Sequence, residues 1–153
     1  MRRTNMDKET LSAREAEAWA AFRDAVGEID PDRRETPGVN VEGWTVKDVL
    51  WHVAHWWNDL VGTLDAMRGG TYVEPPDDDA ATNAENSRVL GESRRMTLAD
   101  VERGLSEARA RVLAAWAALP EVDAAAEREF VWETIDHYEE HLPDLRGFAA
   151  GTA

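Results

Sequence analysis

Apolar residues recur along this chain at steps of three and four, the spacing of one face of an α-helix. The first such segment runs from about Asp7 to Glu28, and the pair Asp30-Pro31 closes it. A loop rich in proline and glycine follows over residues 30–43. The stripe of this first predicted helix consists of Leu11, Ala18, Trp19, Phe22, Val26 and Ile29.

The second predicted helix has the clearest start. Thr45 is a favoured N-cap residue, and Asp48 stands where it can return a hydrogen bond to the Thr45 backbone. Trp44, just before the cap, can pack onto Val49. A glycine pair at 69–70 ends the helix. Its apolar stripe consists of Val46, Leu50, Val53, Trp57, Leu60 and Leu64.

A long acidic connection over residues 69–80 is expected to be a solvated crossover loop. A weaker helix follows over about 80–94. The next helix is predicted to begin at the cap Thr97, with Asp100 as the reciprocal capping partner, and to stop at Pro120.

The last predicted helix spans about Glu129 to Ala149. Pro143 falls inside it, so we expect a kink or a break near Leu142. The chain shows no convincing β pattern and no internal repeat. At 153 residues it is expected to be one domain, residues 1–153. The predicted fold class is all-α, an antiparallel four-helix bundle with one long crossover connection.

Composition and charge exclude several classes of function. The net charge of −14 disfavours binding to nucleic acid or to anionic membranes. No stretch approaches the roughly 18 apolar residues of a membrane span. The start of the chain, residues 1–5, has no apolar segment typical of a secretory signal. The lack of cysteine excludes disulfides, thiolate metal sites and a cysteine nucleophile. A cytoplasmic protein acting on a small molecule is expected.

The four histidines form two close pairs on predicted helices, His52/His55 and His137/His141. On a helical wheel, His137 and His141 lie at the margin of the apolar arc, where they can face a cleft. His52 lies on the shoulder of its stripe, where its second ring nitrogen can reach a carboxylate or carbonyl. His55 lies opposite the stripe and is expected to face solvent.

These positions favour a three-histidine metal site made of His52, His137 and His141. Three neutral imidazoles suit a divalent transition metal; zinc is the first expectation, with nickel, iron and copper as alternatives. Such a metal lowers the pKa of a bound water or thiol and so provides a nucleophile near neutral pH. The simpler alternatives are histidines that complement a helix dipole or are satisfied within the core.

Seven tryptophans are many for a chain of this length. Trp19, Trp57 and Trp116 are expected to be core residues. Trp56 and Trp132, which stand near the two histidine pairs, are predicted to line an apolar substrate pocket. Among the carboxylates near the pairs, Asp136 and Glu140 are candidates for acid or base chemistry.

Two segments resemble a known family. The segment GWTVKDVLWHVAHW (residues 43–56) is similar to the second-helix signature of the DinB-like proteins, especially the branch that contains the mycothiol-dependent maleylpyruvate isomerases. The segment IDHYEEHLP (residues 135–143) resembles the fourth-helix signature of the family. The resemblance covers most of the chain.

This resemblance implies an up-down-down-up four-helix bundle with a metal site near one end. It implies that His52, His137 and His141 are the metal ligands, and that the chain acts as an S-transferase or isomerase using a low-molecular-weight thiol. The chain is expected to differ from the isomerase branch in having no second, C-terminal domain. It has histidine at both positions of the last pair, where that branch places one glutamate.

A second function therefore stays open. Another related branch contains hydrolase-type resistance proteins that are thought not to need the metal. By that resemblance, the chain is a metal-free or structurally metallated protein that binds a small molecule in a tryptophan-lined pocket. Bundles of this kind often dimerise through exposed apolar helix faces, so a homodimer is one expected assembly.

Overall fold

The computed structural model describes residues 7–151, and these residues contain helices and no strand. The expectation about a secretory signal at residues 1–5 lies outside the described residues. The elements are α1 (Lys8–Gly27), the 3-10 turn η1 (Pro31–Arg33), α2 (Val46–Arg68), α3 (Asp79–Ser93), α4 (Leu98–Ala118), α5 (Ala124–Val131), the π-helical stretch η2 (Trp132–Asp136) and α6 (His137–Ala150).

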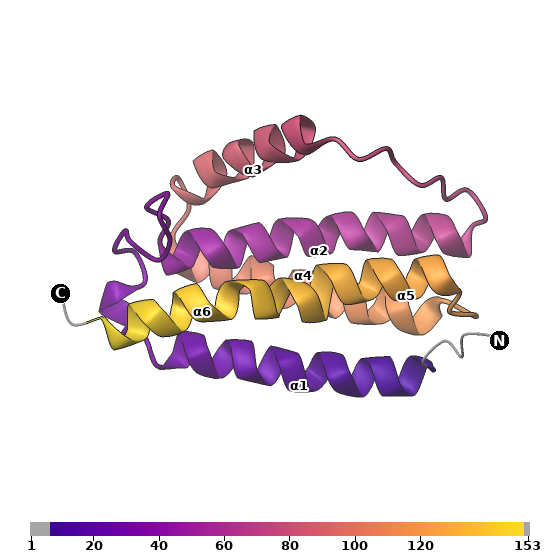
Figure 1. Ribbon diagram of the computed structural model, residues 1–153, viewed down its shortest axis with the longest axis horizontal. Coiled ribbons are helices and arrows are strands. Elements are labelled where there is room, and N and C mark those ends of the chain that lie inside the picture. The colour runs from indigo at the N-terminus through magenta and orange to yellow at the C-terminus, as the bar shows by residue number, and fades with distance from the viewer. Residues whose placement is uncertain (1–6, 152–153) are drawn as a thin grey trace.

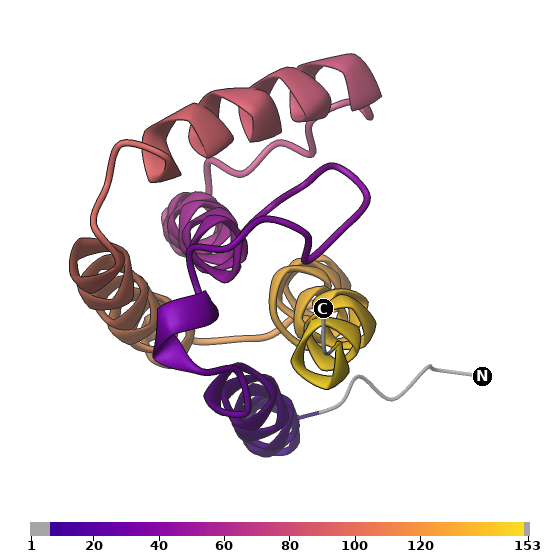
Figure 2. The same ribbon diagram turned by 90° about the vertical axis from the view of Figure 1, so that its left-hand side faces the viewer.

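The helices form a bundle in which α2 packs on α4 and α1 packs on α6 (Figure 2). α1 and the α5–α6 segment run in one direction along the bundle, and α2 and α4 run in the other (Figure 1). α3 lies outside this arrangement, against α2, at the end of the long connection that follows α2 (Figure 1). The fold is therefore all-α, as predicted. None of the described helices is both long and apolar enough to cross a membrane.

Side-chain caps explain where the helices begin. Asp7 accepts a hydrogen bond from the Thr10 backbone N–H at 2.7 Å, which fixes the start of α1. At α2 both bonds of the predicted capping box are formed between Thr45 and Asp48. Thr97 caps α4 as predicted, but the carboxylate of Asp100 pairs with Arg103 at 3.0 Å.

The last helical segment differs from the prediction in two ways. It begins at Ala124, where Asp123 caps α5, and not near Glu129. Of the predicted kink or break near Leu142, the break is wrong, because α6 continues through Pro143. Pro143 has no N–H to donate to the carbonyl of Glu139, one turn earlier. Both residues are exposed, so water can satisfy that carbonyl.

The irregular part of this segment lies earlier, in the π-helical stretch η2. The buried hydroxyl of Thr134 donates to the Phe130 carbonyl at 2.6 Å and thereby satisfies a backbone acceptor where the helix is wider. Single-turn π stretches are frequent at functional sites. This one ends directly before His137.

The core lies between α1, α2, α4 and α5–α6. Trp57 and Trp116 are buried as predicted, whereas Trp19 is half-buried and packs against Trp57. Glu15, which is only 2% exposed, pairs with Arg109 at 2.8 Å and accepts a hydrogen bond from Tyr138 at 2.9 Å. These polar bonds tie α1, α4 and α6 together and fix the rotation of α6 about its axis.

Candidate metal centre

The structure brings His52 of α2 together with His137 and His141 of α6. The Nε2 atoms of His52 and His137 lie 3.0 Å apart. The ring centroid of His141 is 5.2 Å from that of His52 and 4.8 Å from that of His137. One ligand nitrogen from each ring lies within 4.8 Å of the others, so the three histidines could hold a metal ion.

Local sequence explains this convergence. His137 and His141 are four residues apart at the start of α6, so both side chains lie on one face. The neighbouring Tyr138 is fully buried and hydrogen-bonded to Glu15, which keeps that face turned towards α2. Trp44 packs edge-on against His52, with ring centroids 5.1 Å apart. His52 is thereby held between the loop before α2 and α6.

Burial keeps the three imidazoles neutral. It lowers the pKa of His52 to about 3 and that of His141 to about 4. Burial also lowers the pKa of His137 well below its ordinary value, and the neighbouring imidazoles add to this effect. A neutral imidazole has a free nitrogen lone pair, which is the form that binds metals.

The orphaned nitrogens fit a metal as the missing partner. Nε2 of His141 is buried and has no hydrogen-bond partner among the described residues. Ligand nitrogens around a tetrahedral zinc ion stand about 3.3 Å apart, close to the 3.0 Å separation of the His52 and His137 Nε2 atoms. The prediction for the second nitrogen of His52 is wrong: Nδ1 is also unpartnered within residues 7–151, because Asp48 caps α2 and accepts a bond from Ser93 instead.

The comparison with family models adds independent evidence. The model of the mycothiol maleylpyruvate isomerase N-terminal domain matches residues 15–137. The chain belongs to this family. The matched range includes His52 and His137 and stops before His141. No curated protein and no solved structure gave a significant match.

Glu133 lies beside the three histidines, and the sequence analysis did not identify it. Its carboxylate lies 4.0 Å from Nδ1 of His137. Burial raises the pKa of Glu133 to about 8, and nearby carboxylates, first Asp59, raise it further. Its position four residues before His137, on the same face of the helix, could have identified Glu133 in the sequence. The two carboxylates that were predicted instead, Asp136 and Glu140, are both exposed.

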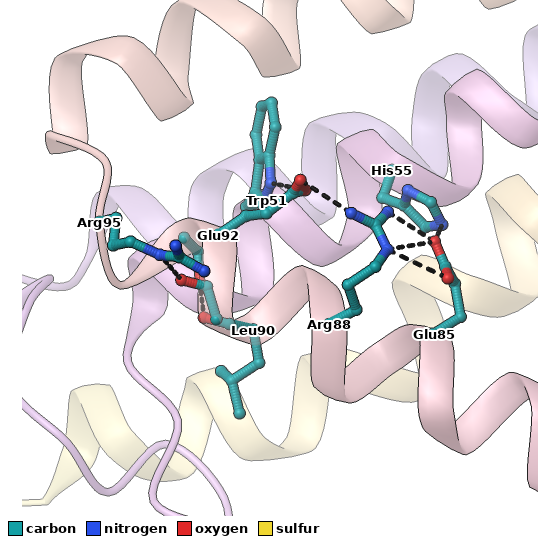
Figure 3. A network of polar contacts seen from close by, with 9 residues as sticks. Trp51, His55, Glu85, Arg88, Leu90, Glu92 and Arg95 are labelled. Carbon is teal, nitrogen blue, oxygen red and sulfur yellow. Dashed lines mark hydrogen bonds and ion pairs between the residues drawn. The ribbon is translucent and has the colours of Figure 1, made fainter.

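His55 lies apart from the three-histidine cluster. It was expected to face solvent, but α3 covers that side of α2 and leaves it half-buried. Its Nε2 lies 3.3 Å from Glu85, which also pairs with Arg88 (Figure 3). His55 therefore belongs to the polar contact between α2 and α3.

The two tryptophans predicted to line the substrate pocket occupy different surroundings. Trp56 is half-buried and donates its indole N–H to Asn86 of α3 at 2.9 Å. Trp132 is 64% exposed on the π-helical stretch. The indole in contact with the cluster is that of Trp44. A substrate-binding role for Trp56 and Trp132 stays a prediction.

Proposed function

We propose that this protein is a metal-dependent enzyme that uses a low-molecular-weight thiol, as an S-transferase or an isomerase. The observation that carries this proposal is the convergence of three neutral imidazoles, two of them buried and one half-buried, each with one unpartnered ring nitrogen. Membership of the mycothiol maleylpyruvate isomerase N-terminal domain family supports the thiol as co-substrate.

In this proposal His52, His137 and His141 each provide one nitrogen to a divalent transition metal, with zinc as the first candidate. The metal supplies Lewis acidity, which lowers the pKa of a thiol or water bound beside the three imidazoles. With three protein ligands, one position remains for that small molecule, as in catalytic zinc sites.

Glu133 has a positioning role in this account. Its carboxylate faces the Nδ1 side of His137, 4.0 Å away. A slight approach lets Nδ1–H donate to that carboxylate, which leaves the Nε2 lone pair of His137 directed towards His52. Because the pKa of Glu133 is about 8, the carboxyl can also release and accept a proton near neutral pH.

Cobalt substitution tests this proposal. The metal-free protein would be loaded with Co(II) and titrated with mycothiol, with S-methyl mycothiol as the matched control that cannot form a thiolate. We expect the visible d–d bands to change and a thiolate charge-transfer band to appear with mycothiol only. A spectrum that both compounds leave unchanged, in a protein that binds Co(II), would refute thiol-dependent chemistry.

A second function is favoured by one contact. The 3.0 Å separation of the His52 and His137 Nε2 atoms is also that of a direct hydrogen bond between two neutral imidazoles. We propose as the alternative that the cluster is structural and that the protein binds small molecules without metal. This alternative predicts that ligand-dependent quenching of tryptophan fluorescence survives chelation; loss of quenching with EDTA would contradict it.

A further inference from the structure

A cavity of about 600 Å³ lies between α1 and α4. The three histidines do not line it: they belong to α2 and α6, whereas the cavity walls come mainly from α1 and α4, which face each other on another side of the bundle (Figure 2). We call this cavity the α1–α4 groove. Its apolar surface is formed by Trp19, Phe22, Val26, Leu50, Leu105 and Leu113.

Direct contacts close the groove where α1 begins. The indole of Trp116 donates to the hydroxyl of Ser12 at 3.0 Å, and Lys8 donates to the Leu119 carbonyl at 2.6 Å. One helical turn further along, Arg109 of α4 pairs with Glu15 of α1. These bonds hold the antiparallel helices α1 and α4 together at this end.

A second bridge crosses the other end. Arg34 donates to the Val26 and Ile29 carbonyls near the end of α1 and pairs with Glu102 of α4 at 3.4 Å. Between this bridge and Arg109 the two helices stand apart. The groove is therefore a site with two polar ends and an apolar floor. Its volume lies in the range of ordinary small-molecule sites.

The charge of the groove is opposite to that of the whole protein. Arg23, Arg34 and Arg109 line it together with one acidic residue, Glu102, in a chain of net charge −14. Within residues 7–151, Arg23 makes no ion pair. The buried Nε of Arg109 has no hydrogen-bond partner in the same range. Both side chains thus have donors that an anion can accept from.

We propose that the α1–α4 groove binds a small amphipathic anion, a carboxylate on an aliphatic or aromatic body. The apolar body lies on the half-buried Trp19, Val26 and Leu113, where it removes exposed apolar surface from water. The carboxylate accepts hydrogen bonds from Arg23 and from Nε of Arg109. Most of the protein surface repels anions, so the groove concentrates them at one place.

Calorimetry of the full-length protein with octanoate tests this inference, with 1-octanol as the uncharged probe of equal length. Three variants would be compared: Arg23→Gln removes the unpaired charge, Ser106→Trp fills the groove, and Arg111→Gln is the control, because Arg111 pairs with Asn58 away from the groove. Arg109 is left intact because its loss would strand the buried Glu15.

We expect octanoate to bind the wild type and the Arg111→Gln variant equally. Arg23→Gln should weaken octanoate binding about three- to tenfold without affecting 1-octanol, and Ser106→Trp should abolish binding of both. Circular dichroism would confirm that each variant is folded. The inference is overturned if octanoate does not bind, if 1-octanol binds as tightly, or if light scattering shows a dimer that the Ser106→Trp variant dissociates, since a second copy would then occupy the groove.

Discussion

At the scale of single residues, burial acts in opposite directions on two kinds of side chain in the candidate centre. It keeps His52, His137 and His141 neutral, with one ring proton each, and it keeps a proton on the Glu133 carboxyl at neutral pH. The imidazoles are thereby ready to bind a cation, and the neighbouring carboxyl is uncharged until the cation arrives. The free energy of unfolding of the metal-free protein therefore depends on pH in both directions.

We therefore predict that the metal-free protein is most stable near pH 6.5. Below that pH the unfolded state, with histidine pKa values near 6.5, binds more protons than the folded state, so stability falls as the pH falls. The folded pKa of Glu133 is about 8 against an ordinary value of 4.5, so this residue makes stability fall as the pH rises towards 8. Urea denaturation from pH 5 to 9, with a chelator present, measures both limbs.

The Glu133→Gln variant separates the effect of Glu133 on stability from that of the three histidines. It should remove the loss of stability between pH 6.5 and 8 and leave the acidic limb in place, because the histidines are unchanged. Glu139→Gln, on the exposed side of α6, is the matched control and should follow the wild type. Superimposable profiles for Glu133→Gln and the wild type would show that the Glu133 carboxyl is not protonated at neutral pH.

At the scale of helices, α2 and α4 form the most extensive helix–helix packing among the described residues. The aromatic ring of Trp51 lies on Gly104: a Cβ atom added at Gly104 would stand 2.6 Å from Cζ3 of Trp51. The same indole donates to Glu92 of α3, so it is held from both sides (Figure 3). Gly104 is therefore required by packing and not by backbone conformation.

Gly104→Ala should destabilise the protein by about 1–3 kcal/mol, because Trp51 has to shift within a packed contact. Gly62→Ala is the control within α2: nothing lies within 4 Å of its added Cβ, so the substitution should be neutral or stabilise by up to about 1 kcal/mol. Thermal or chemical denaturation measures both. Equal effects of the two substitutions would contradict the proposed contact.

The sequence predicted those helix features that depend on neighbouring residues. The caps at Thr45 and Thr97 could be predicted because each acts within one turn. The π-helical stretch before His137 could not be predicted, since η2 packs against α1 and α2 and the neighbouring Tyr138 bonds to Glu15 of α1. Local rules predicted a kink or a break near Leu142. The helix is unbroken there, because water can satisfy the exposed carbonyl that Pro143 leaves without a partner.

At the scale of the whole molecule, the candidate centre joins two helices that are distant in sequence. His52 comes from α2, and His137 and His141 come from α6, across the α2–α6 side of the bundle. The helical wheel could select these three because each lies at the edge of an apolar stripe. The proximity of Glu133 to the cluster and the cover that α3 provides over His55 arise only from packing, so the sequence did not reveal them.

Because the three ligands bridge two helices, metal binding should stabilise the whole fold. A metal at a hundred times its dissociation constant adds about 2.7 kcal/mol, which corresponds to roughly 5–10 °C in melting temperature for a chain of this size. Differential scanning calorimetry with zinc and with EDTA measures the difference. His55→Ala should keep this increase, and His52→Ala should lose it. An equal increase in both variants would place the metal elsewhere.

The most direct test of the metal centre is elemental analysis of untagged protein purified without added metal, with His52→Ala and His55→Ala beside it. The account predicts near one equivalent of a transition metal in the wild type and in His55→Ala, and almost none in His52→Ala. Full metal occupancy in His52→Ala, or no metal in the wild type even after reconstitution, would contradict it.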